Sequence, residues 1–283
     1  MILFKRAADL QLYLETQRKK GKKYGFVPTM GALHPGHISL IHDAGKNNDF
    51  TVCSIFVNPT QFNDPVDFEK YPITLEKDIE ILENAGCNVL FLPSVGEMYP
   101  DGPVLSTRYD FGHLETILEG KFRPGHFQGV GTIVHRLLDI TSPDRFYIGQ
   151  KDYQQCMIIK RLIELIGMKD EIELHIRPTL REAGGLAMSS RNTRLSAIDR
   201  EKAPAIFEAL SIIKAQLKPG NLEGLKAEAI KTLTSKGFKV DYIEIADAGD
   251  LDLVKEWDGE QKLVALAAAF LGEVRLIDNI LLN

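Results

Sequence analysis

The sequence predicts an α/β protein: a Rossmann-like, doubly wound parallel sheet followed by a second, smaller α+β C-terminal domain. Up to about residue 180, short apolar segments alternate with longer segments of helical periodicity, as in parallel strands joined by helical crossovers. Beyond that point two helical segments come first and three strands follow with short connections, which favours an antiparallel sheet. We therefore expect a larger domain over residues 1–177 and a smaller one over 178–283.

The expected elements follow from apolar periodicity and from β-branched and aromatic content. In the larger domain we expect strands over 24–27, 50–57, 88–92, 145–148 and 171–176, and helices over 38–44, 75–82, 130–138 and 153–166. In the smaller domain we expect helices over 199–217 and 222–236 and strands over 239–245, 262–268 and 274–280. Ligands of parallel sheets bind at the carboxyl ends of the strands, so the residues that follow each strand are the candidates for a site.

Composition limits the class of function. The 283 residues include 34 Lys and Arg against 39 Asp and Glu, and the resulting net charge of −5 argues against general binding to nucleic acid. The one basic cluster, 18–23, is interpreted as the solvated end of a first helix. The longest unbroken apolar run, 263–271, is too short to cross a bilayer, and the first residues lack a signal-peptide pattern. We therefore expect a cytoplasmic protein with no membrane contact.

Cysteine usage points the same way. Cys53, Cys87 and Cys156 are far apart and form no Cys-x-x-Cys pair, which indicates a reducing compartment and argues against a disulfide framework or a zinc site. Cys53 and Cys87 lie in or beside apolar stretches, so we expect buried thiols.

The segment 27–38, after the strand at 24–27, holds the strongest candidates for a ligand site. Its glycines allow close approach of a ligand, and Pro35 suits the first position of a helix. His34 and His37 are three residues apart, so both rings can lie on one side of that first turn. A helix N-terminus with imidazole donors suits a phosphate. The alternatives are a metal pair, although no third ligand lies nearby, or one buried histidine beside one exposed histidine.

Two further segments strengthen the phosphate interpretation. In 149–155, which leads from a strand into a helix, Lys151 can meet a phosphate as a point charge and Asp152 can accept from ribose hydroxyls. In 186–192, which follows a glycine pair, two hydroxyls and a guanidinium can close over a polyphosphate. Each segment alone could equally be an ordinary polar turn or surface loop.

A fourth segment suits a different ligand. Asn58 and Gln61 follow the strand at 50–57, and their amides are better suited to a hydroxy acid than to a triphosphate.

Together these segments resemble the adenylate-forming nucleotidyltransferase superfamily, which includes the class I aminoacyl-tRNA synthetases, and within it the pantoate–β-alanine ligase family. The resemblance extends from about Tyr24 to Asn279. The matching motifs are Val27-Pro28-Thr29-Met30-Gly31, His34-Pro35-Gly36-His37, Ser54-Ile55-Phe56-Val57-Asn58-Pro59, Gln61-Phe62, Arg123-Pro124-Gly125-His126-Phe127, Lys151-Asp152-Tyr153-Gln154-Gln155, Met188-Ser189-Ser190-Arg191-Asn192 and Leu276-Ile277-Asp278-Asn279.

The resemblance implies an enzyme that condenses pantoate with β-alanine to pantothenate through a pantoyl adenylate. ATP and Mg²⁺ are used, AMP and pyrophosphate are released, and the family habit is a homodimer. It implies catalytic roles for His34, His37, Lys151 and Arg191, with His37 as proton donor. It implies that ATP binds Met30, Gly31, Ala32, Leu33, His34, Pro35, Gly36, His37, Gly149, Gln150, Lys151, Asp152, Leu180, Met188, Ser189, Ser190 and Arg191. It implies that Gln61 and Gln155 hold pantoate, and that Asn58, Tyr71, Arg123 and His126 line the acid and amine side.

One residue departs from the family pattern. Gln150 occupies a position where the family usually has Glu, which removes a negative charge near the phosphates. No metal ligand is therefore assigned.

Two other functions remain open from the residues. One is a nucleotidylyl transferase of the same superfamily that acts on another small acid or phosphate. The other is a non-catalytic, nucleotide-binding or RNA-associated relative of the synthetases, against which the negative net charge counts. Release of AMP that depends on β-alanine distinguishes the ligase from the first, and a tRNA gel shift together with pyrophosphate release distinguishes it from the second.

Overall fold

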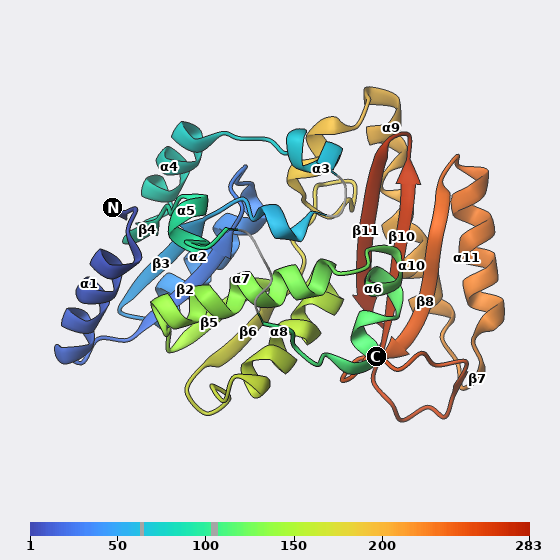
Figure 1. The fold of residues 1–283 in the computed structure, drawn as a ribbon. Coiled ribbons are helices and arrows are strands. Elements are labelled where there is room, and N and C mark those ends of the chain that lie inside the picture. The colour runs from blue at the N-terminus through green and yellow to red at the C-terminus, as the bar shows by residue number, and fades with distance from the viewer. Residues whose placement is uncertain (63–64, 103–106) are drawn as a thin grey trace. The chain divides into compact units, whose positions relative to one another are not determined.

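The computed structural model describes residues 1–62, 65–102 and 107–283, and it confirms the predicted fold class (Figure 1). The chain divides into two compact units. The first comprises Met1–Gly149 and Ile158–Arg177, and the second comprises Gln150–Met157 and Pro178–Asn283. In this division the segment Gln150–Met157 groups with the residues after Pro178, whereas the boundary predicted from the sequence groups it with the residues before Pro178.

The first unit is built on a six-stranded sheet with the order β1-β4-β3-β2-β5-β6, in which every pair is parallel. The strands are β1 (Ile2–Phe4), β2 (Tyr24–Thr29), β3 (Phe50–Ile55), β4 (Val89–Phe91), β5 (Arg145–Gly149) and β6 (Glu173–Arg177). The order reverses between β2 and β5. Doubly wound sheets bind ligands at the carboxyl ends of the strands beside such a reversal, so the residues after β2 and at the end of β5 are well placed.

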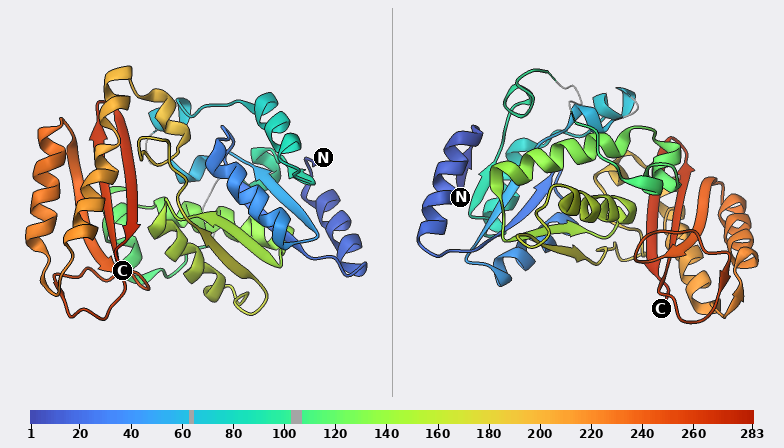
Figure 2. Two further views of the ribbon diagram at one scale, coloured as in Figure 1. Left: turned by 180° about the vertical axis from the view of Figure 1, so that it is seen from behind. Right: turned by 60° about the horizontal axis from the view of Figure 1, so that its bottom comes forward.

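Helices cover both faces of this sheet. The longer helices are α1 (Ala7–Lys19), α2 (Pro35–Asn47), α4 (Leu75–Asn84) and α7 (His126–Thr141), and the shorter ones are α3 (Pro65–Glu69), α5 (Val95–Met98) and α6 (Leu118–Phe122). Helix α1 contacts α7, and α2 contacts α4. Because crossovers between parallel strands are right-handed, these pairs lie on opposite faces, with α7 in front of the sheet in Figure 1 and α2 in front of it in the reversed view of Figure 2.

The second unit is an α+β structure. Its sheet has the antiparallel order β11-β10-β8, and a short antiparallel pair, β7-β9, lies apart from it. The elements are α9 (Ala197–Lys202), α10 (Ala205–Gln216), β7 (Gly220–Asn221), α11 (Glu223–Ser235), β8 (Lys239–Asp247), β9 (Glu256–Trp257), β10 (Leu263–Leu271) and β11 (Val274–Leu281). Helices α10 and α11 pack against each other and against the sheet around a common apolar core. Helix α8 (Tyr153–Leu165) begins in this unit and continues in the first.

Two expectations are corrected by the structure. The single helix expected over 199–217 is two helices, α9 and α10, separated at Ala203–Pro204, because proline has no N–H and its ring clashes with the preceding turn. Strand β1 is absent from the predicted elements, since its three residues are too few to show a period. The expected buried cysteines and the solvated end of α1 are both confirmed. Within the described residues, no helix is long and apolar enough to cross a membrane.

Candidate active site

Helix α2 begins at Pro35, and its first turn carries both predicted histidines. His34 has an extended backbone and forms the N-cap. Its N–H donates to Nδ1 of His37 at 3.3 Å, and the two ring centroids are 4.0 Å apart. The rings therefore lie side by side, as the three-residue spacing predicts. Since Nδ1 of His37 accepts this bond, a neutral His37 carries its proton on Nε2, where it is a donor.

The turn before α2 is held by a buried carboxylate. Gly31 and Ala32 have φ values of 79° and 47°, a left-handed conformation that is unfavourable for alanine. Asp78 accepts from the N–H of Ala32 at 2.9 Å and from the N–H of Leu33 at 2.8 Å, and Oγ1 of Thr74 donates to it at 3.1 Å. Asp78 is 1% exposed. It therefore fixes the backbone that leads into His34.

Asp78 is not among the residues predicted from the sequence, although a signal exists. Leu75, Asp78, Ile79 and Leu82 have the spacing of one helix face, and a carboxylate within such an apolar stripe is buried when the helix packs. A buried carboxylate needs donors, so its position on the stripe indicates a positioning role.

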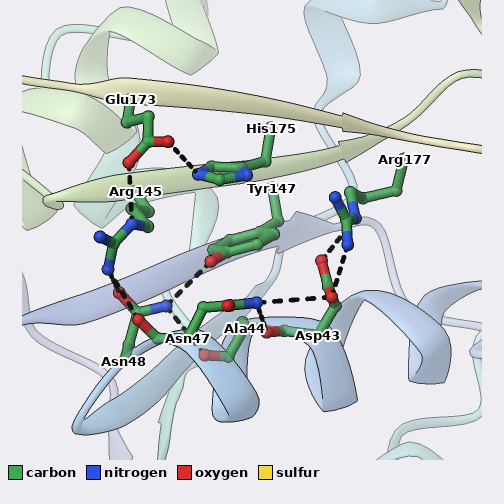
Figure 3. A network of polar contacts seen from close by, with 9 residues as sticks. All are labelled: Asp43, Ala44, Asn47, Asn48, Arg145, Tyr147, Glu173, His175 and Arg177. Carbon is green, nitrogen blue, oxygen red and sulfur yellow. Dashed lines mark hydrogen bonds and ion pairs between the residues drawn. The ribbon is translucent and has the colours of Figure 1, made fainter.

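A polar network holds the other end of α2 against β5 and β6 (Figure 3). Nη2 of Arg177, at the end of β6, donates to Oδ1 of Asp43 at 2.6 Å, and Nδ2 of Asn48 donates to the hydroxyl of Tyr147 on β5 at 3.0 Å. Burial raises the pKa of Tyr147, so the phenol stays protonated. The network continues through Asn47, Arg145, Glu173 and His175. The helix that begins at the two histidines is thus tied to the sheet along its second half.

The residues predicted for the acid and amine side also meet within the first unit. A short 3₁₀ helix, Pro59–Gln61, follows β3. The carbonyl oxygen of Gln61 accepts from Nδ1 of His126 at 2.8 Å and from Nη2 of Arg123 at 3.4 Å. The ring of Tyr71 lies 5.6 Å from that of Phe62, the neighbour of Gln61. The structure therefore brings Gln61, Arg123 and His126 together.

Asn58 is part of the frame of this region. Its Nδ2 donates to the carbonyl of Gly129 at 3.2 Å, and its Oδ1 accepts from the hydroxyl of Tyr99 at 2.7 Å. A Cβ at Gly129 would lie 2.2 Å from the carbonyl oxygen of Thr60, so α7 contacts the 3₁₀ helix without room for a methyl group. With its side chain 1% exposed and bonded within the protein, Asn58 fixes the segment that carries Gln61.

In the second unit, the predicted phosphate-binding residues lie on two segments. Nζ of Lys151 lies 3.8 Å from Oδ2 of Asp152, and their side chains are 20% and 48% exposed. Gln155 is partly buried in the first turn of α8.

The other segment is a small hairpin. The N–H of Met188 donates to the carbonyl of Leu180 at 3.0 Å, and Arg181 and Ala187 pair as an antiparallel bridge. A 3₁₀ helix, Ser190–Arg194, follows, and Oγ of Ser189 accepts from the N–H of Arg191 at 3.3 Å. Leu180 and Met188 are thus brought into direct contact through their backbones, with Ser189 and Arg191 following at once. His34 and His37 belong to the first unit, and Lys151 and Arg191 to the second.

Across the described residues, no group of three or more His, Cys, Asp or Glu side chains is arranged to hold a metal ion. Asp78 already accepts two backbone N–H groups, and Gln150 is uncharged.

A doubly wound sheet with a glycine- and histidine-bearing turn after a central strand defines a class, the nucleotide-binding α/β proteins. Comparison with known proteins narrows this class. The model of the pantoate-β-alanine ligase family matches residues 2–281, and the chain belongs to that family.

Individual relatives agree with this assignment. The chain is 44% identical to the pantothenate synthetase of Cytophaga hutchinsonii, over 100% of this chain and 99% of the relative, and 45% identical to that of Bacteroides thetaiotaomicron, over 96% and 95%. The crystal structure of pantothenate synthetase from Thermus thermophilus has a TM-score of 0.90 and 38% identity, with 99% of each chain covered. The pantoate-β-alanine ligase of Francisella tularensis, complexed with β-γ ATP and β-alanine, has a TM-score of 0.82 and 40% identity, over 99% of this chain and 97% of that one.

Proposed function

We propose that this chain is an ATP-dependent ligase that condenses pantoate with β-alanine to pantothenate and releases AMP and pyrophosphate. The observation that carries the proposal is the family match over residues 2–281. It is supported by the Francisella tularensis structure, which was determined with an ATP ligand and β-alanine.

Each unit supplies part of the proposed machinery. In the first unit, ATP would bind Met30–His37 and Gly149, and pantoate would bind near Gln61, with Asn58, Tyr71, Arg123 and His126 around it. In the second unit, ATP would bind Gln150–Asp152, Leu180 and Met188–Arg191, and Gln155 would contact pantoate.

In the first half-reaction, a carboxylate oxygen of pantoate attacks the α-phosphorus of ATP. The new O–P bond forms as the bond to the bridging oxygen breaks, and pyrophosphate leaves. Such a transfer needs positioning and charge stabilisation more than covalent chemistry by the protein. Nε2–H of His37, with His34, Lys151 and Arg191, would supply donors to the oxygens on which charge develops.

In the second half-reaction, the neutral amine of β-alanine attacks the acyl carbon of the adenylate. A C–N bond forms, the bond from that carbon to the AMP oxygen breaks, and the proton that the amine loses passes to solvent water. Gln61 would serve both substrates, and the bonds of its backbone carbonyl to His126 and Arg123 support this role by fixing the segment that carries it.

Mg²⁺ would enter as the magnesium complex of ATP. Mg²⁺ commonly binds substrate phosphates and retains several waters. A protein without a carboxylate cluster among its described residues fits that mode. The metal would neutralise phosphate charge, while the side chains named above orient the nucleotide.

Oligomeric state and location are also proposals. We expect a homodimer formed through the first unit, which sedimentation analysis would test. A cytoplasmic location is supported by three buried cysteines without a disulfide partner pattern, which suit a reducing compartment. Cell fractionation would test it.

The decisive experiment follows AMP and pantothenate by chromatography after incubation with ATP, Mg²⁺, pantoate and β-alanine, omitting one component at a time. The ligase requires all four components to form pantothenate. When only β-alanine is omitted, pyrophosphate is still released as the bound adenylate forms. A nucleotidylyl transferase would release pyrophosphate at full rate without β-alanine and would yield no pantothenate. That result would overturn the proposal.

A further inference from the structure

Asp278 and Asn279 are consecutive residues of β11. They belong to the motif Leu276-Ile277-Asp278-Asn279, which matches the family but to which no role has been assigned above. Both are polar, and both are 2% exposed. Burial of two adjacent polar side chains is costly unless each finds partners. Their partners lie on the two segments that carry the predicted phosphate-binding residues of the second unit.

The side chain of Asn279 holds the backbone next to Lys151. Its Nδ2 donates to the carbonyl of Lys151 at 2.8 Å and to that of Gln150 at 3.0 Å. Its Oδ1 accepts from Nε2 of Gln150 at 3.1 Å. Because carbonyl oxygens only accept, the amide of Asn279 fits in one orientation. An aspartate there would place an oxygen against both carbonyls.

The side chain of Asp278 holds the hairpin through Arg181. Nη1 and Nη2 of Arg181 donate to its two carboxylate oxygens at 2.6 and 3.0 Å. Arg181 also donates to the carbonyl of Gly185 at 3.1 Å, and its guanidinium lies 3.8 Å from the ring centroid of Phe207. A bidentate pair of this kind fixes both position and orientation. Burial raises the pKa of Asp278, and Arg181 opposes that shift.

We propose that Asp278 and Asn279 are positioning residues for ATP: Asn279 places Lys151, and Asp278 places the hairpin that leads to Arg191. The proposal rests on the proposed function, since it takes these segments to bind the nucleotide. Lysine carries its charge on a flexible stem, so the location of its ammonium depends on how firmly its backbone is held.

The same contacts give Gln150 a role. Its amide donates to Asn279, and this bond orients Asn279 so that both of its N–H groups reach the backbone carbonyls. The side chain of Gln150, the residue that departs from the family pattern, therefore bonds to another side chain of the protein.

The first test compares Asn279→Asp with Asn283→Asp. Asn283 makes one bond of the same kind, from Nδ2 to the carbonyl of Gln261 at 2.8 Å, so the same substitution removes the same kind of donor at an exposed position. ATP affinity is measured by calorimetry without pantoate, so that no turnover occurs. We expect Asn279→Asp to weaken ATP binding at least tenfold and Asn283→Asp to change it less than twofold. Asn279→Ala, which removes both donors without adding charge, covers the case in which the aspartate variant does not fold.

The second test separates positioning from general support of the fold. If Asn279 acts through Lys151, Asn279→Asp has little further effect, under threefold, once Lys151→Ala is present. In steady state the Asn279 variants should raise KM for ATP while KM for pantoate stays within twofold. An equal loss in both backgrounds, or a parallel rise in both KM values, would overturn the proposal.

The third test concerns Asp278. Asp278→Asn should raise KM for ATP at least fivefold, whereas Asp241→Asn, which alters the ion pair with Arg275 at 2.8 Å, should leave it within twofold. An equal rise of KM for ATP in both variants would show that loss of either ion pair weakens ATP binding, and it would rule out a positioning role for Asp278.

Wild-type protein distinguishes this inference from the proposed function. If it forms pantothenate and the Asn279 variants bind ATP normally, the positioning role fails and the ligase stands. If it forms no pantothenate but binds ATP in a way that Asn279→Asp weakens, the ligase fails and the positioning role stands. If it does not bind ATP, both fail.

Discussion

The two units hold their candidate nucleotide-binding backbones with opposite chemistry. In the first unit the carboxylate of Asp78 accepts the N–H groups of Ala32 and Leu33. In the second, the amide of Asn279 donates to the carbonyls of Gln150 and Lys151. The first arrangement engages the N–H groups of Ala32 and Leu33, so a phosphate bound there, as proposed, would rely more on the imidazoles of His34 and His37. In the second arrangement the amide donates to carbonyl oxygens that would otherwise repel a phosphate. These bonds therefore favour an anion near Lys151.

The largest expected effect tests whether both units act in one reaction. His37→Ala and Lys151→Ala should each lower kcat by about 10²- to 10³-fold, or about 2.7–4 kcal/mol, because each removes a donor from developing charge. Pyrophosphate release without β-alanine measures the adenylation step directly.

Controls for these variants lie on α2, the helix that carries His37, and on α8, the helix that follows Lys151. His42→Ala on α2 and Lys160→Ala on α8 alter exposed side chains and should leave kcat within twofold. Near-normal adenylation by either site variant would remove its assigned role and leave the chemistry to the other unit.

The next effect concerns the carboxylate that holds the turn. Asp78→Asn replaces an acceptor oxygen with an NH₂ group that faces a backbone N–H. We expect a loss of about 1–3 kcal/mol in the free energy of unfolding and a rise of about tenfold in KM for ATP. Denaturant unfolding and steady-state kinetics measure the two.

Asp258→Asn is the matched control. Asp258 also accepts two backbone N–H groups, those of Glu260 at 2.8 Å and Gln261 at 3.3 Å, but it is exposed. Its replacement should leave the midpoint of denaturant unfolding nearly unchanged, as is usual for a substitution at the surface. Equal effects at both positions would deny Asp78 a special role.

A smaller effect is expected for Gln61, the residue of the first unit that is proposed to bind pantoate. Gln61→Ala should raise KM for pantoate by about tenfold with ATP affinity unchanged, a loss of about 1.4 kcal/mol in binding. The backbone carbonyl that His126 and Arg123 hold is retained in this variant, so only the side chain is tested. Collapse of ATP affinity instead would show that the pocket is wrongly assigned.

The smallest expected effect is the reaction of the buried thiols with a reagent, which reports local unfolding of each unit. Burial raises the pKa of all three thiols, that of Cys87 to about 11. Native protein should therefore show no reaction with a thiol reagent at pH 8, while unfolded protein reacts at all three. Cys53 and Cys87 report on the first unit and Cys156 on the second. Fast reaction of Cys156 alone would show that the second unit opens independently.

The same thiols set a pH dependence. A pKa raised in the folded state stabilises the fold below the unfolded value near 9, and this contribution is lost as the pH rises towards the folded value of about 11 for Cys87. The free energy of unfolding should fall over that interval, and less so in Cys87→Ser.

The sequence predicts the features that depend on local spacing. Strands and helices follow from apolar periodicity, and the close approach of the His34 and His37 rings follows from their separation and from Pro35. The break at Pro204 is equally local and is missed only because the apolar pattern continues across it.

The frame of the site cannot be predicted in that way. Asp78, Arg181 and Asn279 bond to backbone atoms or to carboxylates far along the chain, and a backbone carbonyl has the same chemistry at every residue. The pair Asp78–Leu33 spans 45 positions and the pair Asn279–Lys151 spans 128. Only the folded arrangement shows which N–H or carbonyl meets each side chain.

The length of that second separation affects how the protein is made. A ribosome that adds about 5–20 residues per second needs about 6–26 s to travel from Lys151 to Asn279, a distance of 128 positions. During that interval the nascent chain contains the lysine but not the strand that fixes it. Contacts between residues so far apart in the sequence form slowly, because the entropy of closing the intervening loop must be lost first. Competence to bind the nucleotide would then arise in one late step, when β11 pairs with β10, and a nascent chain that has not reached β11 would not sequester ATP.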